Sequence, residues 1–242
     1  MRADRYLVDH GYFETRARAQ AAIAAGRVRV NGAVIAKPSQ TIPDGAAIEA
    51  EPAHPYVGRA ALKLVAGLDA FGFDPKGLVC LDVGSSTGGF TEVLLERGAA
   101  RVFAVDVGRD QLHPSLKADP RVTSLEGTDA RDLDLQKLDG ERPAMIVCDA
   151  SFISLEKVLA LPLSLAAPGA KLVALFKPPF EVGRAHVGKG GVVRDVEATG
   201  RAEDNARAFL ARAGFDVLGT LDSPIAGGDG NRERLIGAVK AS

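Results

Sequence analysis

The segment LDVGSSTGGFT, residues 81 to 91, combines a short apolar run with a glycine-rich turn that would open a helix. Gly84, Gly88 and Gly89 permit a tight turn and a close approach of the backbone to a ligand. Asp106 ends the next apolar run, RVFAVD, about twenty positions further on, where a carboxylate can accept hydrogen bonds from the hydroxyls of an adenosine ribose. The pattern predicts a cradle for a nucleotide cofactor, and both NAD and S-adenosylmethionine carry such a ribose.

The shape of the turn favours S-adenosylmethionine over NAD. A pyrophosphate is best held by a GxGxxG turn, whereas this chain has GxxxGG preceded by Asp82. The carboxylate of Asp82 would repel a pyrophosphate but could hold the amino group or the sulfonium side of the methyl donor. Asp129 follows the third apolar run and is placed near the adenine, although a simple loop cap in TDARDL is the alternative reading. The residues expected around the cofactor are Asp82, Gly84, Ser86, Gly88, Asp106, Asp129, Ala130 and Asp149.

Two further polar residues stand at the ends of apolar runs. Asp149 ends AMIVC and Lys177 ends KLVALF, and in an open α/β sheet such positions face one crevice. Pro178 and Pro179 follow at once and would rigidify the exit from that strand. We therefore expect Asp149 and Lys177 to face a substrate together.

Length and composition limit the class of protein. With 242 residues and 46% hydrophobic content, the chain can form one medium domain and one small domain. Cys80 and Cys148 lie in apolar runs, which indicates buried thiols and no disulfide framework. Four histidines without ligand spacing predict no metal site. The N-terminus lacks the apolar core of a signal peptide and no apolar run could span a bilayer, so we expect a cytoplasmic protein.

Apolar runs alternate with helical segments from about residue 58 onward, which predicts a doubly wound α/β sheet. The last two runs, 217–221 and 235–239, are separated by the glycine-rich SPIAGGDGNRE, which is too short for a helical crossover. These two strands should therefore pair antiparallel. The other predicted strands are 78–82, 102–106, 122–125, 145–149 and 171–176.

The first 51 residues predict two short helices and a small sheet. Thr15 is a suitable cap for the second helix, and the strand RVRV leads into an Asn31-Gly32 turn. The stretch DRYLVDHGYFETRARAQAAIAAGRVRVNG resembles the S4 RNA-binding domain. Judged by charge alone, the basic residues of this segment could instead form a solvated surface that binds no RNA. We expect an S4-like domain at residues 1–51, a linker at 52–57 and a larger domain at 58–242.

The larger domain carries a second resemblance. Lys63, Asp149, Lys177 and Glu233 match, in order and strand context, the lysine-aspartate-lysine-glutamate set of FtsJ-like ribose 2′-O-methyltransferases. Seven strands with a terminal antiparallel hairpin resemble the class I S-adenosylmethionine-dependent methyltransferase fold, a Rossmann-like α/β sheet whose last strand is antiparallel. The motifs DVGSSTGGFTEVLL, CDASFISL, FKPPFEVGR and GKGGVVRD resemble those of the TlyA family, bacterial proteins also called hemolysins. The segment RAALKL is close to the family's RGAxKL but has Ala60 in place of glycine.

The resemblance implies methyl transfer from S-adenosylmethionine to the ribose 2′-hydroxyl of a cytidine in ribosomal RNA. A 2′-hydroxyl is a weak nucleophile, so a positioned base is required. We expect Lys177 to accept the hydroxyl proton or to stabilise the alkoxide, with Lys63 nearby favouring the uncharged amine and Asp149 and Glu233 orienting the two lysines. The same carboxylates favour the charged lysine, and the sequence leaves that balance open. The basic residues expected to contact RNA are Arg2, Arg5, Arg16, Arg18, Arg27, Arg29, Arg59, Arg184 and Lys189.

Two other functions are compatible with parts of the sequence. The chain could be a non-catalytic RNA-binding or ribosome-assembly factor, or a membrane-lytic protein, as the hemolysin name suggests. The chain shows no spanning segment and no aromatic-rich basic amphipathic helix, which disfavours lysis. Its length resembles the shorter TlyA type, which favours the large ribosomal subunit. The oligomeric state is not readable from the sequence.

Overall fold

The computed structural model describes residues 1–241 and divides the chain into two compact units. The first unit is Met1–Pro55, and the second begins at Tyr56. The division between them lies inside the 52–57 segment. Within residues 1–241, no helix is both long and apolar enough to cross a membrane.

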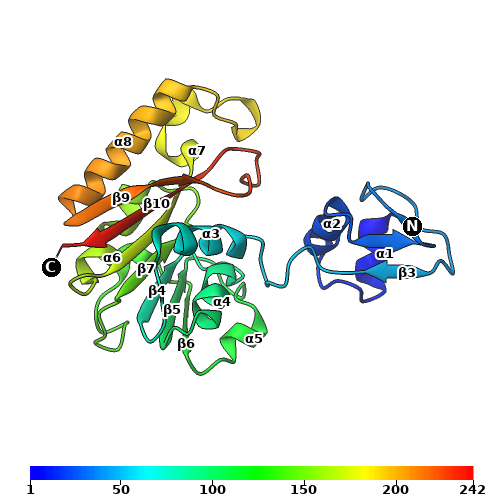
Figure 1. Cartoon of the computed structure of the whole chain (residues 1–242), viewed down its shortest axis with the longest axis horizontal. Coiled ribbons are helices and arrows are strands. Elements are labelled where there is room, and N and C mark those ends of the chain that lie inside the picture. Colours follow the sequence, from blue (N-terminus) through cyan, green and yellow to red (C-terminus); the bar gives the residue numbers. More distant parts are fainter. Residues whose placement is uncertain (242) are drawn as a thin grey trace. The chain divides into compact units, whose positions relative to one another are not determined.

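The first unit packs two short helices against a small antiparallel sheet (Figure 1). Its helices are α1 (Ala3–Asp9) and α2 (Arg16–Ala24), and its strands are β1 (Val28–Val30), β2 (Ala33–Val34) and β3 (Ile48–Ala50), in the order β2-β1-β3. Thr15 caps α2 as predicted, because its hydroxyl accepts a hydrogen bond from the Arg18 N–H. Small alanines let the helices approach closely around Leu7 and Ile23, which are buried.

Most arginines of the first unit are paired with carboxylates. Seven lysines and arginines face six aspartates and glutamates in residues 1–55, so the excess of positive charge is small. The ion pairs are Arg2 and Arg16 with Asp4, Arg5 with Asp9, Arg18 with Glu14, and Arg27 with Glu51. Arg29 instead donates to the Gly32 carbonyl. A contact with RNA phosphates at the paired arginines would therefore compete with these carboxylates.

Asp4 is the centre of this arrangement, because it is fully buried while its arginine partners are half exposed. Its carboxylate accepts hydrogen bonds from Arg2, from Arg16 at 2.8 Å and from Gln20 at 2.8 Å. The hydrogen bond from Arg2, followed by those from Arg16 and Gln20, holds the pKa of Asp4 well below its usual range. Asp4 thereby holds the guanidinium groups of Arg2 and Arg16 in position.

Asp4→Asn should weaken the first unit. A lowered folded-state pKa means that the ionised carboxylate stabilises the fold above the unfolded pKa of about 4, and that this is lost as pH falls through the lower folded value. At pH 7 we expect the amides of α1 and α2 to exchange hydrogen about tenfold faster in the variant, since a hydrogen bond to a charged group contributes about 1.5 kcal/mol. Amides of the second unit serve as the internal control. Unchanged exchange in α1 and α2 would show that the carboxylate does not stabilise the unit.

The second unit is built on a seven-stranded sheet of order β6-β5-β4-β7-β8-β10-β9. Strands β4 to β8 pair in parallel, and β10 pairs antiparallel with both β8 and β9. The prediction that the last two strands pair antiparallel is therefore confirmed. The strands are β4 (Val79–Val83), β5 (Arg101–Asp106), β6 (Val122–Glu126), β7 (Met145–Cys148), β8 (Lys171–Phe176), β9 (Phe215–Asp222) and β10 (Arg234–Lys240).

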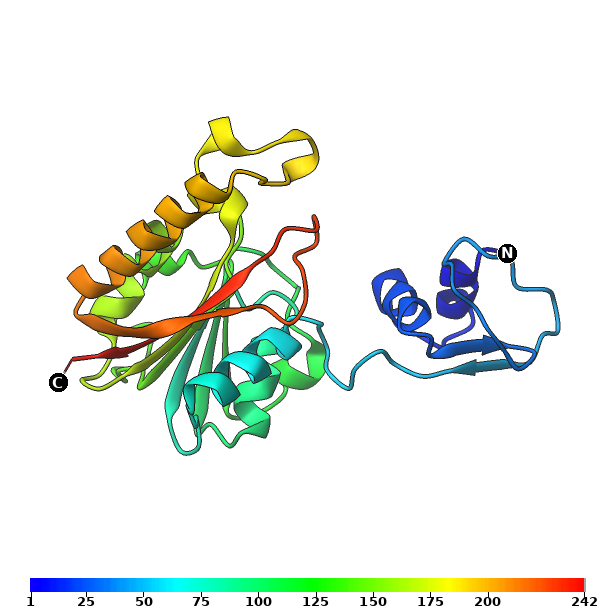
Figure 2. The same cartoon turned by 45° about the horizontal axis from the view of Figure 1, so that its top comes forward.

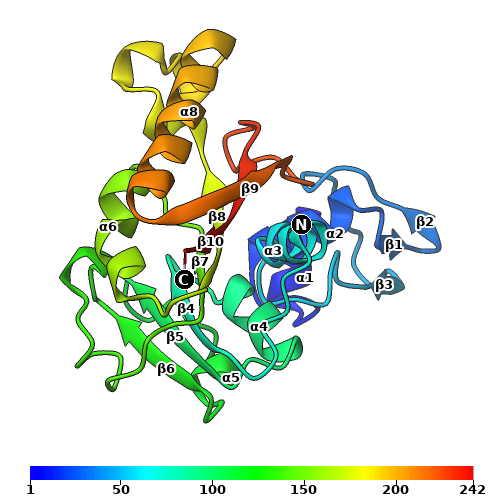
Figure 3. The same ribbon diagram turned by 60° about the vertical axis from the view of Figure 1, so that its left-hand side comes forward.

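Helices cover both faces of this sheet (Figure 3). One face carries α3 (Ala61–Phe71), α4 (Gly89–Glu96) and the short α5 (Pro114–Lys117), and the other carries α6 (Leu155–Leu165) and α8 (Val196–Arg212). Central strands are buried on both sides, which explains their continuous apolar runs. Phe103 and Phe176 are fully buried in the core on the α6 and α8 side. This sandwich positions the turns at the carboxyl ends of the parallel strands.

Candidate active site

The turn between β4 and α4 is shaped by close backbone contacts. Gly84 has φ +83°, and a Cβ there would lie 2.9 Å from the backbone of Ala150, so only glycine fits. A side chain at Gly88, with φ +97°, would collide with Leu112 and Leu116. Asp82 is fully buried, where it accepts a 2.7 Å hydrogen bond from the Thr91 hydroxyl, and burial raises the pKa of its carboxyl to about 7.

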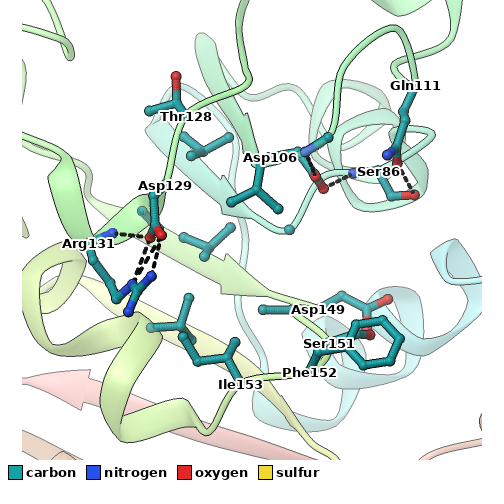
Figure 4. Close-up of a pocket in the computed structure, with 18 residues that line it drawn as sticks. Ser86, Asp106, Gln111, Thr128, Asp129, Arg131, Asp149, Ser151, Phe152 and Ile153 are labelled. Atoms are coloured by element: carbon teal, nitrogen blue, oxygen red, sulfur yellow. Dashed lines mark hydrogen bonds and ion pairs between the residues drawn. The ribbon is translucent and has the colours of Figure 1, made fainter.

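A cavity of about 610 Å³ opens beside this turn, at the carboxyl ends of β4, β5 and β7 (Figure 4). Of the residues predicted to surround the cofactor, this cavity is lined by Gly84, Ser86, Asp106, Asp129, Ala130 and Asp149. Asp82 and Gly88 are not among its lining residues, because the first is buried beneath the turn and the second packs against α5. Their predicted contribution to cofactor binding stays a prediction.

Asp106 lines this cavity and binds the backbone of two other lining residues (Figure 4). One carboxylate oxygen accepts the Ser86 N–H at 2.8 Å and the other accepts the Gly108 N–H at 2.7 Å. A carboxylate oxygen has a second lone pair, so Asp106 can still accept hydrogen bonds from a diol. The hydroxyl of Ser86 also donates to the Gln111 side chain at 3.2 Å.

The other end of the cavity is largely apolar. Ala130, Ile153 and Val158 line it, which suits the flat ring of a base. The carboxylate of Asp129 caps the turn there by accepting the Arg131 N–H at 2.9 Å, and the Arg131 side chain, followed by this backbone hydrogen bond, lowers its pKa. Asp129 is thus both a loop cap and a lining residue.

A second cavity, of about 230 Å³, adjoins the first and shares Gly84, Ser86, Asp149 and Ser151 with it. Lys177 and Arg59 line this second cavity. The ammonium of Lys177 lies 2.6 Å from Asp149 Oδ1, 3.0 Å from the Asp149 carbonyl oxygen and 2.8 Å from Ser151 Oγ. The Asp149 carbonyl oxygen and Ser151 Oγ accept hydrogen bonds from this ammonium, and Ser151 is the neutral, exposed acceptor that a substrate hydroxyl could replace.

Lys63 and Glu233 form a separate buried pair. The Lys63 ammonium lies 2.5 Å from Glu233 Oε2, and both side chains are less than a tenth exposed. Neither residue lines the two cavities. Arg234 pairs with Phe176 in the antiparallel register of β10 and β8, so Glu233, just before β10, and Lys177, just after β8, lie at the same end of these neighbouring strands. The four residues predicted to act together therefore form two ion pairs, Lys177 with Asp149 and Lys63 with Glu233.

The cavities also contain residues that the sequence reasoning did not select. Ser151, Phe152 and Ile153 follow Asp149 directly within the CDASFISL motif. Phe152 is 91% exposed and has φ +67°, a strained conformation for an aromatic residue, and its ring lies 5.2 Å from that of Phe180. Their position just after a strand-ending aspartate was the signal that could have identified them.

Three of the cations predicted to contact RNA belong to the second unit. Arg59, Arg184 and Lys189 are exposed, and within residues 1–241 none of the three forms an ion pair. This differs from the first unit, in which most of the arginines face carboxylates. In the described part of the chain, no group of three or more histidine, cysteine, aspartate or glutamate side chains could hold a metal ion.

Comparison with known proteins gives the family. The model of the FtsJ-like methyltransferases matches residues 56–240, and that of the S4 domain matches residues 1–48. A Mycobacterium tuberculosis protein named 16S/23S rRNA (cytidine-2′-O)-methyltransferase TlyA is 43% identical over 97% of this chain and 88% of its own length. The chain belongs to the TlyA family of FtsJ-like methyltransferases.

Two other similar proteins are informative. A Campylobacter jejuni protein named 23S rRNA (cytidine-2′-O)-methyltransferase TlyA is 41% identical over 76% of this chain and 71% of its own length. A solved Streptococcus thermophilus structure that carries a hemolysin name superposes with a TM-score of 0.79 and 37% identity, covering 100% of this chain and 89% of its own. The sheet with its reversed β10 is the class I methyltransferase fold that the sequence predicts, preceded by an S4 domain.

Proposed function

We propose that this protein transfers a methyl group from S-adenosylmethionine to the ribose 2′-hydroxyl of a cytidine in ribosomal RNA. The observation that carries the proposal is the pair of adjoining cavities, one suited to an adenosine-bearing donor and one holding Lys177 against Asp149. The names of the Mycobacterium and Campylobacter relatives supply the nucleotide and the class of RNA. Both names include 23S rRNA, so we favour the large subunit.

The larger cavity fits the cofactor by its chemistry. Asp106 would accept hydrogen bonds from the ribose hydroxyls, and the apolar end near Ala130 and Ile153 would enclose the adenine. Gly84 and Asp149 line both cavities, so the methionine end would lie where the two meet. When bound, the cofactor supplies an electrophilic methyl group on a sulfonium.

Lys177 is the residue we assign to the reacting hydroxyl. Its ammonium could donate to a 2′-oxygen in place of Ser151 and stabilise the negative charge that develops on this oxygen, whereas the uncharged amine of Lys177 could instead take up the hydroxyl proton. Asp149 would hold Lys177 in position through two contacts. The buried Lys63–Glu233 pair would support the strand ends from which Lys177 projects.

The target nucleotide would be placed by groups at the rim of the second cavity. The exposed ring of Phe152 offers a face on which a base taken out of its stack could lie. Arg59 is an unpaired cation on the lining of the same cavity as Lys177, where it could contact the phosphate next to the target ribose. These contacts would determine the orientation of the ribose.

Transfer of labelled methyl from S-adenosylmethionine to ribosomal subunits lacking the modification tests the proposal. We expect ribose label in large subunits, mapped to one cytidine by the nuclease resistance of the modified dinucleotide. Small subunits assayed in parallel decide whether the enzyme acts on one subunit or both. Label on a base instead of a ribose would contradict the proposed reaction.

The same assay separates the other two functions. RNA binding without any methyl transfer, despite measurable cofactor binding, would indicate a non-catalytic RNA-binding factor. Leakage of lipid vesicles caused by the purified protein would favour the lytic function that the hemolysin name suggests.

A further inference from the structure

The segment between α7 (Pro178–Glu181) and α8 forms a loop with regular backbone turns (Figure 2). It contains two 3-10 turns, Arg184–His186 and Lys189–Gly191, and a β-bridge between Val187 and Val193. The Gly188 N–H donates to the Val192 carbonyl at 3.0 Å, which closes the loop on itself. A cavity of about 210 Å³ lies within it and is lined by His186, Gly188, Lys189, Val192, Arg194 and Asp195.

Asn231 fastens this loop to the turn that precedes β10. Its side-chain oxygen accepts the Val193 N–H at 2.9 Å, and its side-chain nitrogen donates to the Gly191 carbonyl at 2.9 Å. The side chain is 5% exposed, so both amide groups are committed to these backbone partners. Removing this side chain, which bridges two loops about forty residues apart, would leave two backbone groups, the Val193 N–H and the Gly191 carbonyl, without these partners.

The cavity is lined by two cations, Arg194 and Lys189, and the second is among the residues predicted to contact RNA. Lys189 and Arg194 are exposed, and neither forms an ion pair within residues 1–241. The carboxylate of Asp195 is already engaged, because it accepts the Ala198 N–H at 2.9 Å as the cap of α8 and lies 2.9 Å from His186 Nδ1. Two cations without an ion-pair partner beside a small cavity are suited to bind an anion.

We propose that this cavity is a phosphate seat for one phosphodiester of the RNA backbone, and that Asn231 is the positioning residue that keeps the seat formed. The nature of the ligand rests on the proposed function, since an RNA substrate supplies phosphodiesters. A preordered loop loses less conformational freedom on binding than a disordered one, so the clamp strengthens the contact without touching RNA. Contacts to phosphate position the RNA and do not read its sequence.

Four full-length variants test the phosphate seat. Asn231→Ala removes both clamp hydrogen bonds, and Asn231→Asp keeps the acceptor for Val193 while losing the donor to Gly191. Lys189→Gln combined with Arg194→Gln removes the cations and leaves the clamp intact. Arg207→Gln is the matched control, because Arg207 is an exposed cation on α8, about 18 Å along the helix from Asp195.

The readouts are trypsin cleavage and RNA affinity. Trypsin can cut after Arg184, Lys189 and Arg194, and we expect cleavage there to be about tenfold faster in Asn231→Ala than in the wild type, because the local opening is no longer opposed by the clamp. The Kd for a large-subunit ribosomal RNA transcript should rise about tenfold in Asn231→Ala and in the double charge variant. The slope of log Kd against log salt should fall by about 0.9 in the charge variant, as expected for one lost phosphate contact.

Three outcomes would overturn parts of the proposal. If the charge variant has the same Kd and salt slope as Arg207→Gln, the cavity does not hold a phosphodiester. If Asn231→Ala is cleaved faster but binds RNA as the wild type does, the clamp does not serve RNA binding. If cleavage is unchanged, Asn231 does not position the loop. Binding needs no methyl transfer, so a wild type that binds RNA through the seat but transfers no methyl group would contradict only the proposed function.

Discussion

Replacing Lys177 with alanine should slow methyl transfer about 10³-fold while the affinity for S-adenosylmethionine changes less than about twofold. The reason is that the Lys177 ammonium lines the second cavity and not the first, so its loss removes the group beside the reacting hydroxyl and spares the cofactor. Single-turnover methyl transfer to large ribosomal subunits measures the rate, and calorimetry measures the affinity for the cofactor.

Two control variants make the Lys177 result specific. Lys157→Ala removes an exposed lysine of α6 and should leave the rate unchanged. Lys177→Arg keeps a positive charge but replaces the compact ammonium with a planar guanidinium group. This group stays protonated, so it cannot accept the proton of the reacting hydroxyl. Partial activity in Lys177→Arg would indicate charge stabilisation, whereas activity as low as in alanine would indicate proton transfer. Near-normal turnover in Lys177→Ala would remove this residue from the mechanism.

Lys63→Met should destabilise the second unit by about 3–5 kcal/mol, because it leaves the Glu233 carboxylate buried without its partner. Methionine is close to lysine in length, so the packing of α3 is disturbed little. Denaturant unfolding followed by a signal from the second unit measures the loss of stability.

The double variant Lys63→Met with Glu233→Met separates stability from activity. An apolar pair of similar volume can replace a buried ion pair without loss, so we expect most of the stability to return. Methyl transfer should stay at least about 100-fold below the wild type if the pair also supports Lys177 in the reaction. A double variant with normal stability and normal turnover would show that the pair is structural only.

The strand pattern and the direction of the last strand were predictable because they depend on local features. Central strands such as β7 are buried on both sides and therefore read as continuous apolar runs. The short connection between β9 and β10 excludes a helical crossover and so requires an antiparallel pair. Both predictions are confirmed, as is the S4 segment at the N-terminus.

The site was predictable only in part. Asp106, Asp149 and Lys177 end strands, and residues at the carboxyl ends of parallel strands converge, so their meeting at one edge follows from the sheet. Whether each of the named residues binds cofactor or RNA stays a prediction. The pairing of Lys63 with Glu233 joins residues 170 positions apart, and it depends on how α3 packs beside β10.

The sequence by itself determined the fold class, the S4 segment and the glycine-rich turn between β4 and α4, because apolar periodicity, glycine positions and strand-ending carboxylates are local properties of the chain. Only the tertiary structure decided which of the polar residues reach a cavity. Asp82 is the clearest case, since its position before the glycine turn suggests a ligand contact, whereas the packing of α4 buries it against Thr91. The clamp of Asn231 on Gly191 and Val193 likewise depends on two distant loops lying together. Such contacts are set by how the elements pack in three dimensions, which residue types and spacing do not specify.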